Sequence, residues 1–428
     1  MRPMTRGGAR AEDERLSMIR RYAVVRDATE ALAAPLSAED QTVQSMPDVS
    51  PTKWHRAHTT WFFETFLLAP HLPGYRPFDP AYGYLFNSYY EAVGSRHPRP
   101  ERGLLSRPGI AEIARYRAHV DAAMAELLAD LDGSRPRLLA LVELGLQHEQ
   151  QHQELVLMDI KHVLSLHPLQ PIYHAVALSD PVTAPPLVWH DVAGGLRQIG
   201  HDGAGFAFDN ETPRHRVWLE PFRLASRLVT CGEYAEFIAA GGYRRAEFWL
   251  SDGWAAVQQQ GWTAPLYWRE EEGGWTLFTL AGRRPVHPAE PVVHVSFYEA
   301  DAFARWAGKR LPAEAEWEVA AVEGGIPLDG NLCRRGATLH PEPARGGGFM
   351  QMVGDVWEWT ASPYTAYPGF RPVAGAIGEY NGKFMSNQMV LRGGAAVTPA
   401  GHVRLTYRNF FPPASRWVFG GIRLAEDA

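Results

Sequence analysis

QHEQQHQELVLMDIKH, residues 147–162, is the stretch on which the interpretation of this chain depends. It lies in a run from Leu146 to Leu166 that contains neither Gly nor Pro, and its apolar residues favour a helix. The run places His148 and His152 four residues apart, so both imidazoles lie on one face of that helix. Two imidazoles at this spacing can bind one metal ion, which makes the stretch a candidate metal site.

The string His148-Glu149-x-x-His152 also matches the HExxH motif of zinc proteases. The third histidine of the extended protease motif would fall at Met158. The other zincin pattern takes a glutamate from a following helix, yet no Glu occurs between Glu154 and Glu211. These departures disfavour a protease.

A third ligand is expected from PTKWHRAHTTWFFETF, residues 51–66. His58 leads into an aromatic run that should face a helical core, whereas His55 comes nearly one turn earlier. We therefore predict His58 as the third ligand, and His55 lies either on the surface or beside a ligand. Three neutral imidazoles suit Zn, Cu, Fe or Ni, so the ligands alone do not choose the metal.

The first part of the chain predicts a four-helix bundle, a frame that builds metal sites from facing helices. Pro35 should end the first helix, and Pro51 suits the first turn of the second. A long crossover, residues 71–108, joins the second helix to the third and is of a length that is often functional. The helices are expected at residues 13–34, 51–68, 109–131 and 136–166.

Beyond a proline-rich connector the sequence becomes rich in Gly and Trp, with short β-type runs, and predicts an α+β domain. The β-type runs are residues 214–225, 274–280, 291–297 and 388–394, and two helices are expected near residues 231–240 and 296–307. The predicted boundaries are a flexible leader over residues 1–15, the bundle over 16–166, a linker over 167–185 and the second domain over 186–428.

The bulk composition narrows the class of protein. The 428 residues suit two domains, and a net charge of -6 argues against a nucleic-acid or anionic membrane surface. No stretch reaches the length of a membrane span. Only two cysteines occur, which favours a reducing, cytoplasmic setting over a disulfide scaffold. We expect small-molecule substrates, and the composition leaves the oligomeric state open.

The crossover is dense in residue types that carry chemistry. Tyr89 and Tyr90 are adjacent, and a phenol beside an oxygen-activating metal can donate a proton. Arg99 and Arg102 offer planar donors for a carboxylate, or alternatively pair with acids of the bundle. Gln151, one residue before His152, can reach a substrate bound at the metal. The roles expected for Glu154 and Asp159 are to support a ligand or a neighbouring helix, or for Asp159 simply to be solvated.

Several long segments together resemble the EgtB-type sulfoxide synthases of ergothioneine biosynthesis. In the first part these are SPTKWHRAHTTWFFETF, LFNSYYEAVGSRHPRPERGLLSRP and LGLQHEQQHQELVLMDIKH. In the second part they are PVVHVSFYEADAFARWAGKRLPAEAEWEVAA, GDVWEWTASPY, FMSNQMVLRGG and RLTYRNFFPPASRW. The resemblance implies a DinB-like four-helix bundle joined to a formylglycine-generating-enzyme-like domain of C-type-lectin-like fold. It covers nearly all of residues 16–427.

The resemblance implies an Fe(II) enzyme that uses O2 to join the sulfur of a thiol to the imidazole C2 of hercynine as a sulfoxide. By position, His58, His148 and His152 match the iron ligands and Gln151 a hercynine contact. Arg99 and Arg102 match the pair that holds the carboxylate of the thiol, and Tyr89-Tyr90 resembles the branch that uses free cysteine. The second domain is expected to reach the substrates through Asn409, Phe410 and Phe411, whose aromatic faces suit a quaternary ammonium.

The chain departs from the family pattern in two places. Val418-Phe419-Gly420-Gly421 stands where a Gln and a small hydroxyl residue precede the Gly, and Ala395-Ala396 stands where Ser-Cys is commoner. Related enzymes with γ-glutamylcysteine or a selenosugar as donor are therefore alternatives. A divalent-metal thiol transferase or hydrolase on the same bundle, and a binding module, are the alternatives from other classes.

Trp357-Glu358-Trp359 and Arg392-Gly393-Gly394 are predicted to be structural. Cys231 and Cys333 do not lie in matching motifs, so sulfatase modification is not predicted.

Overall fold

The computed structural model describes residues 6–131, 135–176 and 182–428, with side chains from residue 15 onward. Two compact units divide the chain, and each is described by itself. The first comprises Met1–Leu166 and Ala374–Tyr380, and the second His167–Val373 and Asn381–Ala428. The first is helical and the second mixes helices with short strands, which confirms the predicted fold class. In the described residues no helix is long and apolar enough to cross a membrane.

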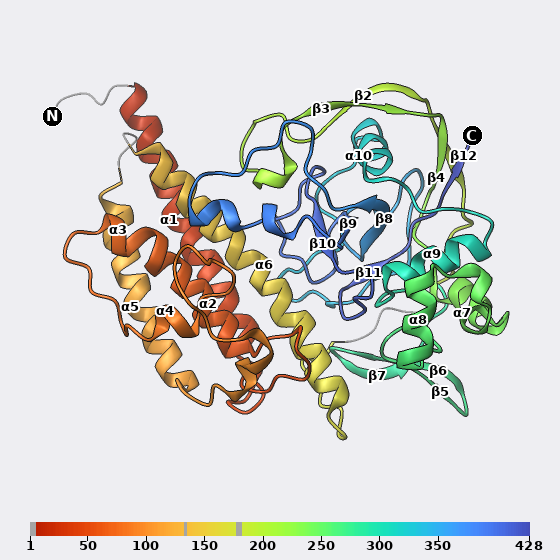
Figure 1. Ribbon diagram of the computed structural model, residues 1–428, viewed down its shortest axis with the longest axis horizontal. Coiled ribbons are helices and arrows are strands. Elements are labelled where there is room, and N and C mark those ends of the chain that lie inside the picture. Colours follow the sequence, from red (N-terminus) through yellow and green to blue (C-terminus); the bar gives the residue numbers. More distant parts are fainter. Residues whose placement is uncertain (1–5, 132–134, 177–181) are drawn as a thin grey trace. The chain divides into compact units, whose positions relative to one another are not determined.

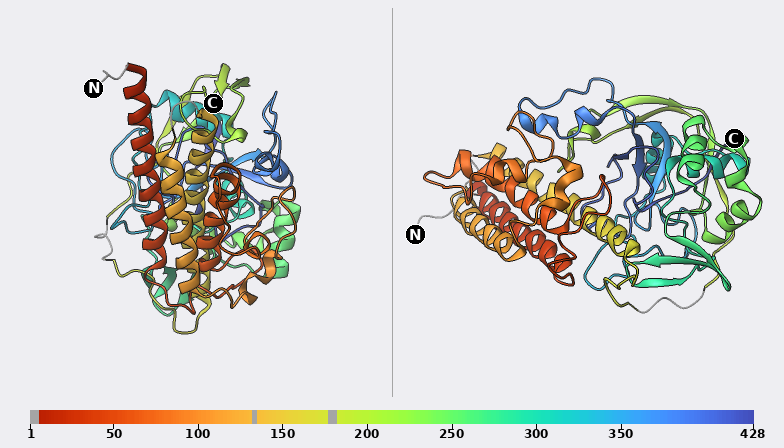
Figure 2. Two further views of the ribbon diagram at one scale, coloured as in Figure 1. Left: turned by 90° about the vertical axis from the view of Figure 1, so that its left-hand side faces the viewer. Right: turned by 60° about the horizontal axis from the view of Figure 1, so that its bottom comes forward.

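In the part of the first unit that the structure describes, four long helices lie side by side (Figure 1; Figure 2, left). All four were expected from the sequence, although the second changes its winding after Phe63. Their bounds are α1 Arg6–Ala33, α2 Thr52–Phe63, α5 Ile110–Ala129 and α6 Pro136–Leu166. Helix α1 begins inside the segment predicted as a leader, of which residues 1–5 lie outside the described residues. The short elements of this unit are η1 Glu64–Leu68, α3 Ala69–His71, α4 Tyr82–Leu85, η2 Arg99–Leu104 and η6 Ala376–Glu379.

Helix α2 is the centre of the bundle, since all twelve of its residues are buried. It packs against α5 and α6. The close approach to α6 requires Gly145, where an added Cβ would lie 2.7 Å from the ring of Phe63. A π-helical turn, η1, continues α2 and turns Glu64 inward, where it accepts hydrogen bonds from Tyr75 and Tyr116. The helix that carries His58 is therefore held on several sides.

Within its described residues, the second unit contains four small sheets, with strand orders β1-β4-β12, β10-β9-β8-β11, β2-β3 and β5-β6-β7. The strands are β1 Trp189–Val192, β2 Gly195–Ile199, β3 His215–Leu219, β4 Phe222–Ala225, β5 Trp268–Glu271, β6 Gly274–Thr279, β7 Gly282–Pro285, β8 Trp357–Pro363, β9 Met389–Arg392, β10 Asn409–Phe411, β11 Gly420–Gly421 and β12 Ala425–Asp427. The helices are α7 Cys231–Ala239, α8 Ser251–Gln260, α9 Phe297–Trp306 and α10 Glu314–Glu323, with the short turns η3 Asp209–Glu211, η4 Gly242–Arg244, η5 Ala246–Phe248 and η7 Gly382–Phe384.

One predicted strand, residues 291–297, is wrong. Its valines are buried, but His294 has a φ of 65°, which breaks the extended run. The backbone of the segment bonds to separate places instead of one neighbour: Val292 N–H donates to Val229 and Val295 N–H to Gly420. A run of β-branched residues here reflects burial and not a ladder.

Helices α8 and α10 were not predicted. In α10 the residues Glu314, Glu316 and Glu318 alternate with apolar ones, a pattern closer to a strand than to an amphipathic helix. The structure explains the pattern because the glutamates pair with arginines, including Glu318 with Arg392 at 2.5 Å.

The residues predicted to be structural occupy the core of the second unit. Trp359 donates its indole N–H to Val295 O at 2.9 Å, and Glu358 forms an ion pair with Arg423 in which both side chains are fully buried. The segment 418–421, where the sequence departs from the family pattern, lies in this core too. A Cβ at Gly420 would stand 2.8 Å from the Trp359 indole, and β11 pairs with β8 through this segment. The glycines therefore serve sheet packing.

Candidate metal centre

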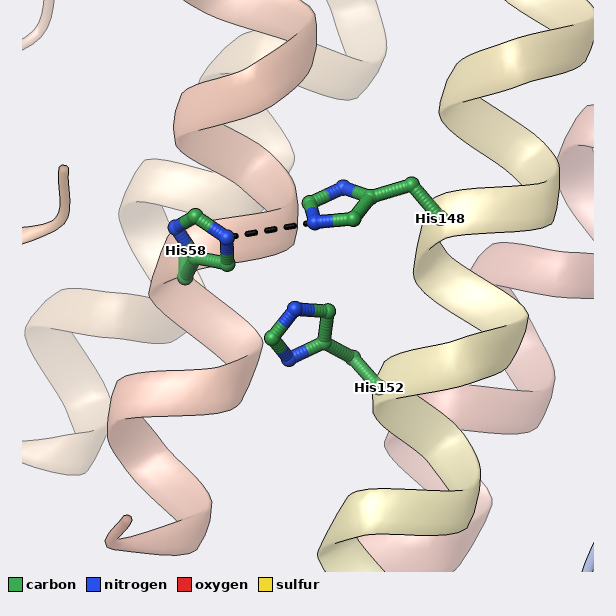
Figure 3. Close-up of side chains that lie close together, drawn as sticks. All are labelled: His58, His148 and His152. Carbon is green, nitrogen blue, oxygen red and sulfur yellow. Dashed lines mark hydrogen bonds between the residues drawn. The ribbon is translucent and has the colours of Figure 1, made fainter. Parts of the chain in front are cut away.

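Three histidines from two facing helices converge inside the bundle (Figure 3). Helix α2 supplies His58, and α6 supplies His148 and His152 one turn apart. Each offers a ring nitrogen, and these nitrogens all lie within 4.8 Å of one another. His58 Nε2 and His148 Nε2 are 3.2 Å apart. The three residues predicted as ligands thus form a group that can hold a metal ion.

Two of these histidines have their other ring nitrogen occupied. His58 Nδ1 lies 2.6 Å from the carbonyl oxygen of Phe86, which can only accept, so Nδ1 carries the proton and Nε2 keeps its lone pair. His152 Nδ1 lies 2.8 Å from His55 Nδ1, and His55 Nε2 lies 3.0 Å from Asp159 Oδ2. His55 is only 2% exposed, so the structure selects the position beside a ligand and not the surface.

Burial keeps the three imidazoles neutral. It lowers the pKa of His148 to about 3 and holds the pKa of His58 and of His152 well below the usual value. Neighbouring histidines add to the lowering at His58 and His152. Neutral imidazoles are the form that binds metal, so the donor set fits a divalent transition metal.

Glu149, the glutamate of the HExxH string, faces another partner. It is fully buried and accepts hydrogen bonds from Arg26 at 2.9 Å, Arg117 at 3.1 Å and Thr29 at 2.6 Å. Burial alone would raise its pKa, but Arg26 and Arg117 outweigh burial and lower it. A carboxylate engaged in this way is a structural ion-pair centre, which argues against its use as the base of a zinc protease.

A tyrosine that sequence reasoning missed lies at the histidines. Tyr380 comes from the segment Ala374–Tyr380, which belongs to the first unit although it is 229 residues from Gln151 along the chain. Its hydroxyl donates to Gln151 Oε1, and its ring centroid is 5.6 Å from that of His148. Glu379 accepts the backbone N–H groups of Glu91 and Ala92 at 2.9 and 3.0 Å and so attaches the segment to the crossover. The tyrosine sits in a Gly-rich stretch without periodicity, so no sequence signal marked it.

The two predicted tyrosines lie beside Tyr380. Tyr89 packs on Tyr380 with ring centroids 6.0 Å apart, and Tyr90 stacks on Tyr89 at 4.7 Å. Tyr90 is fully buried, and burial followed by the neighbouring Tyr89 raises its pKa well above the usual value. Its phenol is therefore protonated at neutral pH. Tyr89 and Tyr90 stay predicted as catalytic groups.

Of the two predicted carboxylate-binding arginines, Arg102 is buried and Arg99 is exposed. The Arg102 guanidinium lies 3.4 Å over the Trp54 ring, and Trp54 stacks on His58 at 4.6 Å. Arg102 donates to the hydroxyls of Ser50 and Ser88, and among the described residues its Nε has no hydrogen-bond partner and no ion pair involves it. Arg99 donates to the carbonyl of Asp48. A buried guanidinium without an acidic partner fits an anion supplied by a substrate.

Asn409, Phe410 and Phe411 form strand β10 in the second unit. Phe410 stacks on Tyr364 with centroids 4.0 Å apart and an interplanar angle of 9°. All three residues are partly exposed. Their role as substrate contacts stays a prediction.

Comparison with known proteins finds a family match for each of the two units. Residues 21–156 match the DinB superfamily, and residues 177–344 and 331–428 match the sulfatase-modifying factor enzyme 1-like domain. The chain is 36% identical to a hercynine oxygenase of Mycobacterium tuberculosis, over 89% of this chain and 92% of that protein. It is 34% identical to a hercynine oxygenase of Mycolicibacterium thermoresistibile, over 89% and 88%. A formylglycine-generating enzyme of Streptomyces coelicolor is 31% identical over 53% of this chain and 84% of its own length.

The DinB-type bundle with its histidine cluster, joined to a sulfatase-modifying-factor-like domain, places the chain among two-domain oxygenases. The chain belongs to the hercynine oxygenase family, and the predicted resemblance to the ergothioneine-pathway sulfoxide synthases is confirmed.

The thiol of Cys231 is buried with a raised pKa, which leaves it unsuited to the thiolate chemistry of a reactive cysteine.

Proposed function

We propose that this protein is an Fe(II)-dependent sulfoxide synthase that joins the sulfur of cysteine to the imidazole C2 of hercynine. The reaction consumes hercynine, cysteine and O2 and yields hercynylcysteine sulfoxide and water. One oxygen atom enters the sulfoxide, and the other leaves as water with the protons of the C2–H and S–H groups. The observation that carries the proposal is the cluster of three neutral histidines in a chain of the hercynine oxygenase family.

His58, His148 and His152 would hold the iron. The donor chemistry fits, because each ring is neutral and two of the three have the second nitrogen hydrogen-bonded. Bound Fe(II) would supply redox chemistry with O2 and, as a cation, would favour the thiolate form of the donor. The residues around the cluster bind and orient the organic substrates.

Arg102 would bind the carboxylate of cysteine. Its guanidinium is fixed by the hydroxyls of Ser50 and Ser88 and by the face of Trp54, which leaves it pre-oriented for an anion. Trp54 also stacks on His58, so the anion site and the metal ligand share one wall. Arg99, exposed beside it, adds positive charge. Gln151, whose carbonyl accepts from Tyr380, would contact hercynine.

Tyr380 would donate a proton or a hydrogen bond to the oxygen chemistry, and Tyr89 and Tyr90, which stack next to it, stay candidates for the same role. Replacing Tyr380 by Phe removes only the hydroxyl. We expect sulfoxide formation to fall by about 100-fold or more, the scale of a lost general acid, while Co(II) affinity stays unchanged. Rapid-mix product analysis measures the rate, and Tyr84→Phe, a change at an exposed ring, is the matched control. A Tyr380→Phe protein that forms sulfoxide at the parental rate would refute this role.

Cysteine is the proposed donor because the pair Tyr89-Tyr90 resembles the branch of the family that uses free cysteine. We expect O2 consumption by the Fe(II)-loaded protein only when hercynine and a thiol are both present, with cysteine preferred over γ-glutamylcysteine in kcat/KM. An oxygen electrode and product mass analysis with each thiol measure this. Activity with Zn(II) and without O2 would favour a thiol transferase or hydrolase instead. We place this chemistry in the cytoplasm, because the sequence contains only two cysteines.

A further inference from the structure

We propose that His55 and Asp159 are positioning residues that hold His152 in its metal-binding tautomer and thereby set the metal affinity of the site. This inference deepens the proposed function and rests on it only for the identity of the metal. It concerns two residues that contribute no atom to the three-histidine cluster.

The carboxylate of Asp159 fixes the direction of the two hydrogen bonds that link Asp159, His55 and His152. The Asp159 carboxylate oxygen Oδ2 can only accept, so the proton of His55 lies on Nε2, 3.0 Å away. A neutral His55 then presents a lone pair at Nδ1. Because that lone pair faces His152 Nδ1 at 2.8 Å, the proton of His152 must lie on Nδ1. His152 Nε2 is left with the lone pair that a metal requires.

The hydrogen-bonded series Asp159, His55 and His152, called the relay below, lies on the same two helices that supply the three histidines of the cluster. His55 lies three residues before His58 on α2, and Asp159 lies seven residues after His152 on α6. The backbone N–H of Ser50 donates to Asp159 Oδ2 at 2.8 Å, which fixes the carboxylate. The tautomer of His152 is therefore coupled to the packing of α2 on α6.

The burial of these groups argues for a role beyond packing. His55 is 2% exposed and Asp159 4% exposed, and the second carboxylate oxygen of Asp159 has no hydrogen-bond partner among the described residues. A buried carboxylate that is only partly satisfied costs stability, whereas apolar side chains at both positions would avoid that cost. The ligands also differ: His58 is oriented by a backbone carbonyl, so His152 is the ligand whose orientation depends on replaceable side chains.

The test is the affinity of the full-length apo-protein for Co(II), read from the visible spectrum of the ion without hercynine, thiol or O2. We expect His55→Phe, which removes both nitrogens at similar volume, to bind Co(II) about 10–100-fold more weakly. His55→Asn keeps an acceptor near the position of Nδ1 and should recover part of the loss. His119→Phe, at an exposed histidine of α5, should bind like the parent.

Thermal unfolding of each apo-protein separates positioning from folding. An affinity loss with a parental unfolding midpoint supports the relay. Parental Co(II) affinity in His55→Phe overturns it, and if that variant does not fold, parental affinity in Asp159→Ala overturns it equally. A parent that binds Co(II) through the histidines yet makes no sulfoxide would contradict the proposed function while this measurement still decides the relay.

Discussion

Replacing His58 by alanine is expected to abolish stoichiometric metal binding. His58 is the one ligand from α2, so its loss leaves only the pair on α6. Catalytic metal sites of this kind use three protein ligands. The loss should exceed the roughly 10–100-fold effect of an outer partner, and O2 consumption should disappear with it. Anaerobic titration with Fe(II), followed by metal analysis of the desalted protein, measures the effect.

The matched control for His58 is His119→Ala. His119 is an exposed histidine of the same bundle, on α5, so its loss should leave the metal content at that of the parent. Full metal content in the His58 variant would show that a different residue completes the site.

Replacing Glu149 by alanine is expected to destabilise the bundle by about 3–5 kcal/mol. The reason is that Arg26 and Arg117 are each almost fully buried and would both lose the central carboxylate. Their remaining acidic partners, Asp121 and Glu30, are the more exposed ones. Urea unfolding of the full chain, followed by far-UV circular dichroism, gives the change in midpoint.

Glu149→Gln is the control that separates charge from shape. It keeps an acceptor for Thr29 and the volume of the side chain, so a smaller loss is expected than with alanine. A folded Glu149→Gln protein that still forms sulfoxide would also rule out Glu149 as a catalytic base. Parental stability in Glu149→Ala would contradict the assignment of this residue as the centre of the ion-pair network.

The cluster of three histidines could be predicted because its signals are local. His148 and His152 follow from helical spacing, and His58 from the aromatic run that marks the buried face of α2. The identity of the family followed from long motifs, which comparison with known proteins confirms. In these cases the signal lies within a few residues of the feature that it marks.

The residues that were missed depend on contacts distant along the chain. Tyr380 reaches Gln151 across 229 residues, and no periodic pattern surrounds it. The choice between surface and interior for His55 likewise depended on Asp159, 104 residues away. The strand predicted at residues 291–297 failed for the same reason, because its backbone bonds to separate, distant segments. Local pattern cannot supply such pairings.

We propose that this protein uses O2 to place an oxygen atom on a newly formed carbon–sulfur bond. The most direct measurement is the mass of the product formed from hercynine and cysteine under ¹⁸O₂ by the Fe(II)-loaded protein. We expect a hercynylcysteine sulfoxide in which the sulfoxide oxygen carries the label, with no product in the absence of O2. A product that forms without O2, or a sulfoxide oxygen that comes from water, would contradict it.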